Sequence, residues 1–317
     1  MSNFSNYAAI GGPNGTTIKP GGRVAAYVRS TGAQDGDDHF AASGLLVASL
    51  NDACRRCRPN QNDIIYVLPG HVETISAADG LSNLVAGTQI IGAGTPGASN
   101  NPTITWGATA ATLLLDVANV TLAGLNLNWI GVDNVVVAIP VTAAGCSILD
   151  CVITAESASA GILKGIEVAA GGSGFRFCRN TVVSVGEAHP LTSAVVLISG
   201  AADDILVADN YIAAANPGTN VLGHVAVTAA ATNVRIVRNT FIQLETAGTA
   251  LYVVTVGDVA STGYAAHNFC KIGSAVTATT SGFTVGTAGL VGFGLFENYV
   301  TDTEAGRSGV LSPVVAA

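Results

Sequence analysis

One short pattern recurs along most of the sequence and limits what the chain can fold into. An apolar residue is followed by variable positions, a slot that is usually asparagine, one more variable position and a second apolar residue, as in Val234–Phe241 (VRIVRNTF). Successive slots are 32, 26, 29, 30, 29, 29 and 30 residues apart. A fixed period of this length indicates a repeat architecture. The slots are Ala93, Leu125, Cys151, Asn180, Asn210, Asn239, Asn268 and Asn298.

The stretches between the slots are typical of short β-strands. Alternating apolar runs such as Ser193–Ile198 (SAVVLI) and Ala250–Val256 (ALYVVTV) are separated by turns rich in glycine, aspartate and asparagine. Leucine-rich repeats have a similar period, but their L-x-x-L-x-L framework is missing here. We therefore expect an all-β chain that folds as a single parallel β-helix, with coils of about 29 residues and two or three strands per coil.

The asparagines of the slot are candidates for a structural ladder. When one corner of every coil carries the same amide, each side chain can bond to its neighbour or to the turn backbone. Asparagine also tolerates the left-handed backbone that such corners require, so we expect it to occupy the left-handed position itself. The ladder residues are Asn180, Asn210, Asn239, Asn268 and Asn298, and Cys151 would continue the column as a small buried side chain.

The segment before the first coil carries a second pattern. Residues 27–38 (YVRSTGAQDGDD) predict a turn, and residues 39–57 predict an amphipathic helix that closes the open end of the coil. Residues 63–75 (DIIYVLPGHVETI) have the character of a first strand followed by Pro-Gly. The apolar face of the predicted helix consists of Phe40, Leu46, Val47 and Leu50, followed by Cys54 and Cys57.

With these features the sequence resembles the right-handed parallel β-helix proteins of the pectate-lyase-like superfamily. The resemblance covers residues 24–302 and rests on the repeated slot, the turn before the helix and the DIIYVLPGHVETI segment. It implies a right-handed, N-terminally capped parallel β-helix over 24–302, preceded by an arm over 1–23 and followed by a tail over 303–317.

Within that superfamily the sequence is most similar to tailed-phage virion proteins encoded near head genes. This likeness implies a non-enzymatic head decoration, or cement, protein that is made in the host cytoplasm. Such a protein would bind the major capsid protein on the capsid exterior as a homotrimer and stabilise contacts between capsomers. The candidate capsid contacts lie in the N-terminal arm, at Asn3, Phe4, Tyr7 and Ile18.

Composition argues against two classes of partner. Only 11% of the residues are charged and the net charge is −8, so the chain lacks the clustered Lys and Arg that neutralise nucleic-acid phosphates. The uncharged stretch 272–296 is long enough to span a bilayer, but its threonine, serine and glycine content indicates strands and turns. We expect neither a nucleic-acid nor a membrane partner. No secretory signal is visible, so the six cysteines are expected to be reduced and buried.

The alternative function is that of a tailspike-like β-helix protein that binds a receptor or degrades a polysaccharide. Glycan lyases and hydrolases use paired carboxylates as acid and base or as Ca²⁺ ligands. Neighbouring coils offer no acid to match Asp203 and Asp204, which favours a solvated corner. Asp37 and Asp38 directly precede the predicted helix, where carboxylates suit helix capping. The candidate acids are Asp37, Asp38, Asp203, Asp204 and Asp209.

Other catalytic or metal-binding patterns are weak. Cys54 and Cys57 have C-x-x-C spacing, but a zinc site needs a second pair, so we expect both thiols to pack in the core. The histidines show no HExxH motif and no i,i+4 pairing. We therefore expect no metal and no cofactor. The histidines are His39, His71, His189, His224 and His267.

Overall fold

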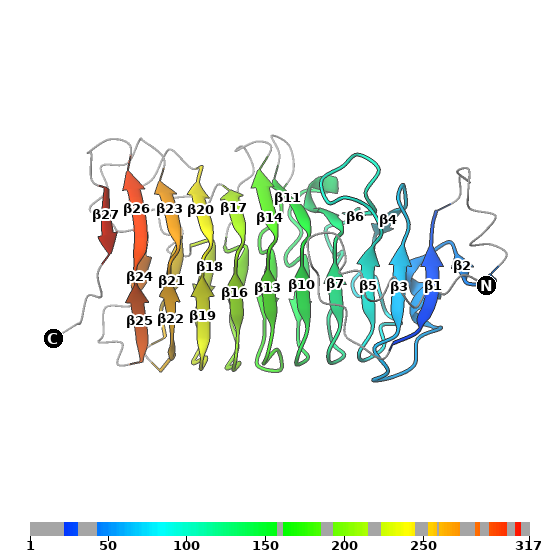
Figure 1. Cartoon of the computed structure of the whole chain (residues 1–317), viewed down its shortest axis with the longest axis horizontal. Helices are drawn as coiled ribbons and strands as arrows, with labels where there is room; N and C mark the ends of the chain where they lie inside the picture. The colour runs from blue at the N-terminus through cyan, green and yellow to red at the C-terminus, as the bar shows by residue number, and fades with distance from the viewer. Residues whose placement is uncertain are drawn as a thin grey trace.

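The chain folds into an elongated rod along which three β-sheets run side by side (Figure 1). The computed structural model describes residues 22–30, 43–156, 161–184, 193–214, 223–244, 253–258, 260–272, 283–285, 292–302 and 308–311. Sheet 1 consists, in spatial order, of β2 (Leu46–Val47), β1 (Val24–Val28), β3 (Ile64–Val67), β5 (Gln89–Gly92), β7 (Thr121–Ala123), β10 (Ser147–Leu149), β13 (Arg176–Cys178), β16 (Leu206–Ala208), β19 (Val234–Val237), β22 (Gly263–Ala266) and β25 (Phe293–Phe296).

In the other two sheets the strands follow one another along the rod in the order of the sequence. Sheet 2 consists of β4 (Val72–Ile75), β6 (Thr103–Trp106), β8 (Asn126–Asn128), β11 (Val152–Glu156), β14 (Thr181–Ser184), β17 (Tyr211–Ala214), β20 (Thr240–Gln243), β23 (Phe269–Ile272), β26 (Asn298–Asp302) and β27 (Ser308–Leu311). Sheet 3 consists of β9 (Ile139–Val141), β12 (Ile166–Val168), β15 (Val196–Ile198), β18 (Val225–Val227), β21 (Val254–Val256) and β24 (Phe283–Val285).

Successive coils pair in parallel, which confirms the expected parallel β-solenoid. Six coils contribute one strand to each sheet, from β7–β9 to β22–β24. Their strands meet in register at the predicted period, so that Ser147 of one coil lies beside Arg176 of the next, and Arg176 beside Leu206. Within the described residues, β27 differs because it pairs antiparallel with β26.

The core fills the inside of the coil because side chains alternate between the two faces of each strand. In the three-residue strands β7, β10, β13 and β16 the central residue points inward. Leu122, Ile148, Phe177 and Val207 therefore form one column in register, and each is fully buried. Full burial of an apolar side chain of this kind stabilises the fold by about 1.5–3 kcal/mol. The repeating apolar positions therefore supply much of the stability of the rod.

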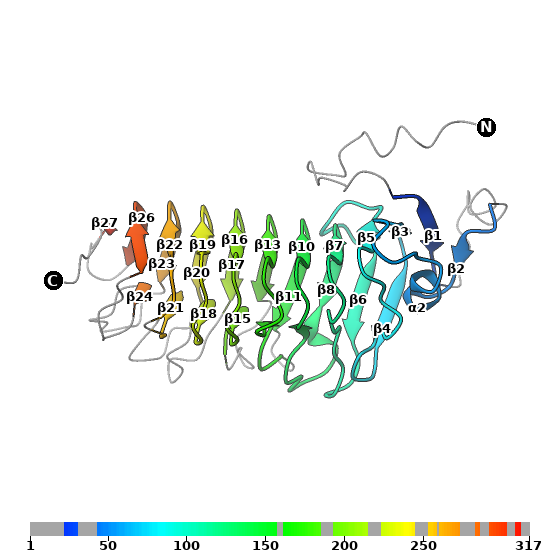
Figure 2. The same cartoon turned by 90° about the horizontal axis from the view of Figure 1, so that it is seen from below.

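The predicted helix over 39–57 is wrong for most of its length within the described residues. Leu46 and Val47 form β2 and pair in parallel with β1, and α2 covers only Leu50–Cys54 beside these two strands (Figure 2). Ser49 explains the late start, because its extended backbone and its side chain, which accepts a hydrogen bond from the Asp52 amide, make it an N-cap. Residues 39–42 lie outside the described part of the chain. A single 3₁₀ turn, η2 (Trp129–Gly131), follows β8.

Candidate functional site: the asparagine corner

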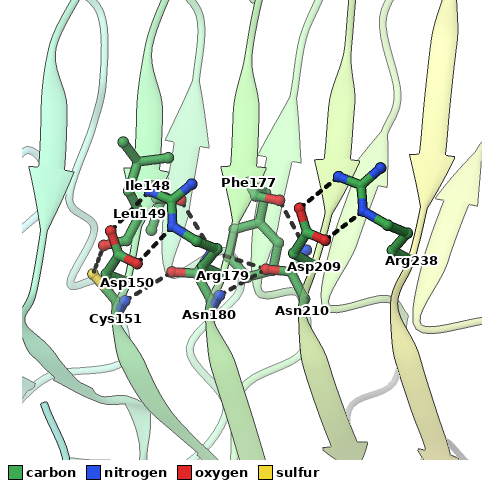
Figure 3. A network of polar contacts seen from close by, with 10 residues as sticks. All are labelled: Ile148, Leu149, Asp150, Cys151, Phe177, Arg179, Asn180, Asp209, Asn210 and Arg238. Atoms are coloured by element: carbon green, nitrogen blue, oxygen red, sulfur yellow. Dashed lines mark hydrogen bonds and ion pairs between the residues drawn. The ribbon is translucent and has the colours of Figure 1, made fainter. Parts of the chain in front are cut away.

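The five slot asparagines lie one above another at the corner between sheets 1 and 2, and all are at most 2% exposed. The Asn210 Oδ1 atom accepts hydrogen bonds from the backbone N–H and the side-chain amide of Asn180, at 2.9 and 3.1 Å (Figure 3). The Asn180 amide also donates to the Ile148 carbonyl at 3.0 Å, so both of its hydrogens are used. The same arrangement repeats at Asn239, Asn268 and Asn298.

The left-handed backbone position precedes the asparagine, and the expectation that asparagine itself adopts this conformation is wrong. Turning the chain one residue earlier directs the side chain of the left-handed residue outward and the asparagine side chain into the corner. Gly124 has the same conformation before Leu125, with φ of 66°. The left-handed residues, with φ between 49° and 58°, are Asp150, Arg179, Asp209, Arg238, His267 and Glu297.

The outward-pointing left-handed residues pair with one another between successive coils. Arg179 contacts Asp150 through two bonds of 2.8 and 2.9 Å, and Arg238 contacts Asp209 through two bonds of 2.7 and 2.8 Å (Figure 3). His267 Nδ1 lies 3.0 Å from a carboxylate oxygen of Glu297. The hydrogen bonds that Arg179 donates to Asp150 raise the pKa of the guanidinium further above its ordinary value. This column of charges lies outside the asparagine ladder, and its bonds run along the rod.

Cys151 occupies the slot before Asn180 and marks where the amide ladder begins. Its backbone N–H donates to Asn180 Oδ1 at 3.0 Å, and its thiol donates to the Leu149 carbonyl at 3.3 Å (Figure 3). Burial raises the pKa of this thiol to about 12, so it remains protonated at neutral pH. Leu125 fills the preceding slot as a fully buried apolar residue.

All six cysteines are buried thiols. Cys54 and Cys57 lie at the N-terminal end, where both belong to the core. Burial raises the pKa of Cys54 to about 12 and also raises that of Cys57. In the described ranges, no group of three or more His, Cys, Asp or Glu residues is arranged to hold a metal ion.

The two groups of candidate acids in the coil lie at different corners. Asp209 pairs with Arg238, whereas Asp203 and Asp204 lie at a second corner and are exposed. There Thr232 and Asn233 of the next coil donate to the carboxylates of Asp203 and Asp204, respectively. The Asp203 amide also donates to Ser173 Oγ of the previous coil, at 3.0 Å. Asp37 and Asp38 lie outside the described residues.

A buried polar network joins the N-terminal elements, and no sequence pattern predicted it. His71 Nδ1 accepts the backbone N–H of Ser30 at 2.8 Å, so its Nε2 atom carries the hydrogen and donates to Glu73 at 3.0 Å. The same Glu73 oxygen accepts the backbone N–H of Leu50, the first residue of α2, at 3.1 Å. The Ser30 hydroxyl accepts the Val72 N–H and does not reach the imidazole, so the group connects elements and does not form a nucleophilic triad.

The remaining predicted site residues fall into two groups. His224 is fully buried and its ring stacks on Phe241, with centroids 6.2 Å apart. The predicted capsid contacts and two histidines lie outside the described residues: Asn3, Phe4, Tyr7, Ile18, His39 and His189. In the described part of the chain, none of the helices has the length and apolar character needed to cross a membrane.

Comparison with known proteins gives little further information. No protein-family model and no curated protein matches the sequence. Among solved structures, the chain is similar to one described as "Geobacillus virus E2 - ORF18", with 12% sequence identity and a TM-score of 0.30. The alignment covers 82% of this chain and 59% of that chain, so this chain spans about three fifths of the length of the matched protein.

Proposed function

We propose that the chain is a structural protein of a tailed-phage virion, and specifically a head decoration protein. In this role it binds the major capsid protein on the outside of the head as a homotrimer and stabilises contacts between capsomers. The sequence resemblance supports the virion role. The N-terminal arm over 1–23, with Asn3, Phe4, Tyr7 and Ile18, is the proposed capsid contact.

One observation supports a structural role: the polar groups at the asparagine corner bond to one another between adjacent coils. Each ladder amide bonds to the backbone and side chain of the adjacent coil, and each charged residue outside the ladder pairs with its counterpart in an adjacent coil. Polar side chains that satisfy one another along the axis stiffen a rod. A rod held in this way suits a protein that reinforces a shell and undergoes no reaction of its own.

Copy number tests this proposal directly. Quantitative mass spectrometry of purified virions would give the number of copies of this chain relative to the major capsid protein. We expect hundreds of copies, because a decoration protein occupies many symmetric sites on the head. A handful of copies, or none, would contradict the decoration role.

A polysaccharide-degrading tailspike is the second candidate, and the exposed Asp203–Asp204 pair is the observation that favours it. Its test is an assay for new reducing ends or unsaturated products on acidic polysaccharides. We expect no cleavage by the wild-type protein. Cleavage that is lost in Asp203→Ala and retained in the corner control Asp209→Ala would establish the tailspike function instead.

A further inference from the structure

Exposed aromatic side chains gather in one register column of sheet 2. Thr181, Tyr211, Thr240, Phe269 and Tyr299 are successive register partners on β14, β17, β20, β23 and β26 (Figure 1), and we call them the aromatic column. The three rings are 37–41% exposed, and those of Phe269 and Tyr299 stack with centroids 5.6 Å apart. Six large apolar side chains are exposed in the described residues, and half of them lie in this column.

The aromatic column itself is uncharged. Charged side chains border it on one side, where the charged column lies two residues earlier in the sequence and its members pair with one another. On the other side, the outward-facing positions two residues further along these strands include Val183, Ala213 and Ile242. Lys271 is the single charge at those positions where the side chain is described. A partner that covers the aromatic column and the side of it away from the corner therefore desolvates little charge, whereas the chain as a whole has a net charge of −8.

The protein covers the same face itself nearer the N-terminus. Asn126 lies in the same register column, on β8, and its Oδ1 atom accepts hydrogen bonds from the Gly97 amide at 3.0 Å and the Asn101 side chain at 3.1 Å. The loop that carries Gly97 and Asn101 therefore lies against this part of the sheet. From β17 onward, three rings of the column remain accessible. The loop thus covers the face at β8, whereas the face is open from β17 onward and at Val72 on β4, which belongs to the same register column and is 55% exposed.

The spacing of the aromatic column fits a second copy of the same chain. Neighbouring strands lie about 4.8 Å apart, and threonine alternates with a ring at Thr181, Tyr211, Thr240 and Phe269. A partner whose own side chains repeat at this spacing can bury all the rings together. Another copy of the solenoid, set parallel to the first, has this spacing, and the aromatic column brings no carboxylate of its own to the contact.

We infer that copies of this chain associate through the aromatic column, with three copies facing a common threefold axis. The trimeric state rests on the proposed function, and the contact surface is the new element. Around an axis parallel to the rod, the same residue from each copy meets at the same height. Layers of three rings at Tyr211 and Phe269 then alternate with a layer of three threonines at Thr240. The Tyr299 layer follows the Phe269 layer directly, with the two rings of each chain stacked on each other.

The test measures the oligomeric state of the full-length chain by analytical ultracentrifugation. Tyr211→Glu and Phe269→Glu each place three carboxylates in one layer at the axis. Phe296→Glu is the matched control, because Phe296 is 48% exposed but lies on sheet 1. We expect a wild-type trimer, a trimeric control and largely monomeric column variants, with association weakened on the order of 30-fold or more. Circular dichroism checks that each variant is folded.

A second variant provides a test that does not depend on loss of association. Thr240→Cys places a thiol near the axis in each copy, and the native cysteines are all buried, so oxidation should give a disulfide-linked dimer on a non-reducing gel. Suppose that the wild type is a trimer, that the glutamate variants also remain trimeric, and that Thr240→Cys does not cross-link. These results together would overturn the surface and leave the homotrimer standing. A monomeric wild-type chain would overturn the surface and the trimer together. The virion copy number is measured independently of both results.

Discussion

At the scale of the residue, two neighbouring positions of each corner have different tasks. The left-handed residue directs its side chain outward and pairs in the charged column, while the next residue directs an amide inward. The inner position could be recognised in the sequence because asparagine fills it in five successive coils, from Asn180 to Asn298. The left-handed position could not, because aspartate, arginine, histidine and glutamate all occupy it and its conformation is imposed by the corner.

Removal of one ladder amide should destabilise the fold strongly. Asn239→Ala leaves the backbone and side-chain donors of Asn210 without their acceptor and the Val207 carbonyl without its donor. Because each buried group left unsatisfied costs about 1–3 kcal/mol, we expect the free energy of unfolding to fall by at least about 3 kcal/mol in urea titrations. The control Thr240→Ala changes the adjacent, partly exposed residue and should cost well under half as much. Equal losses would show that the ladder is not a main source of stability.

His224 should make stability depend on pH. Burial lowers its pKa from 6.5 to about 4, so between these values the unfolded chain binds more protons than the folded chain. The free energy of unfolding therefore falls as the pH drops from 6.5 to 4, by about 3 kcal/mol over the range. In His224→Leu we expect this part of the pH dependence to disappear.

Urea unfolding of the wild type and His224→Leu at pH 7 and at pH 4.5 would measure the effect. This range avoids Asp63, because hydrogen bonds from the Arg58 side chain lower the pKa of that carboxyl to about 2, so its contribution to stability is lost only as the pH falls below about 3.8. If the two proteins lose the same stability between the two pH values, His224 does not carry the dependence.

At the scale of the element, local sequence predicted the strands well and the first helix poorly. The strand pattern recurs at a similar distance from the slot in each coil, so the prediction of strands in one coil supports their prediction in the others. The apolar spacing of Leu46, Val47 and Leu50 fits a helix, but pairing with β1 places the first two in a strand. That pairing is a tertiary contact that helix periodicity does not contain. The aromatic column escaped the sequence reading for a similar reason, because its members come together only when five coils are in register.

Two ion pairs of the charged column offer a matched comparison of how coils are joined. Arg179–Asp150 joins the coils of β10 and β13, and Arg238–Asp209 joins those of β16 and β19, with closely similar geometry. Asp150 is 1% exposed at its side chain, whereas Asp209 is 38% exposed. Both arginines are left-handed, so alanine costs the same backbone strain at each position.

We expect Arg238→Ala to lower the free energy of unfolding by less than about 1 kcal/mol, as for other exposed pairs. Arg179→Ala should cost about 2 kcal/mol more, because it leaves the buried Asp150 carboxylate without its cation. Urea titrations at low and at high salt would measure both, and the Arg238 effect should be the more sensitive to salt. The reverse order of effects would contradict the burial argument.

At the scale of the whole molecule, each coil contacts mainly its two neighbours, so the rod should tolerate loss of complete coils. Deletion of Thr181–Asn239 joins Asn180 directly to Thr240, which is in register with Thr181, and removes the Asp209–Arg238 pair intact. We expect a shorter solenoid that still unfolds cooperatively, with Asn180 donating to Asn268. Far-UV circular dichroism and small-angle X-ray scattering would show the retained sheet and the reduced length.

The control for the coil deletion removes about half a coil from the same starting residue. That change moves apolar side chains to the outer face and breaks the asparagine register, so we expect it to prevent folding. If both deletions unfold the protein, the coils depend on contacts more distant than their neighbours.

The charged column joins coils two by two, and this has a consequence for how the chain finds its native winding. The asparagine ladder repeats unchanged from Asn180 to Asn298, so a chain that skipped one of these coils while folding would still pair the remaining amides. The charges would not match, because such a slip places Arg179 next to Arg238 and leaves Asp209 without its partner. Like charges side by side destabilise adjacent strands. The alternating signs thus distinguish the correct winding of the chain from one that is displaced by a single turn.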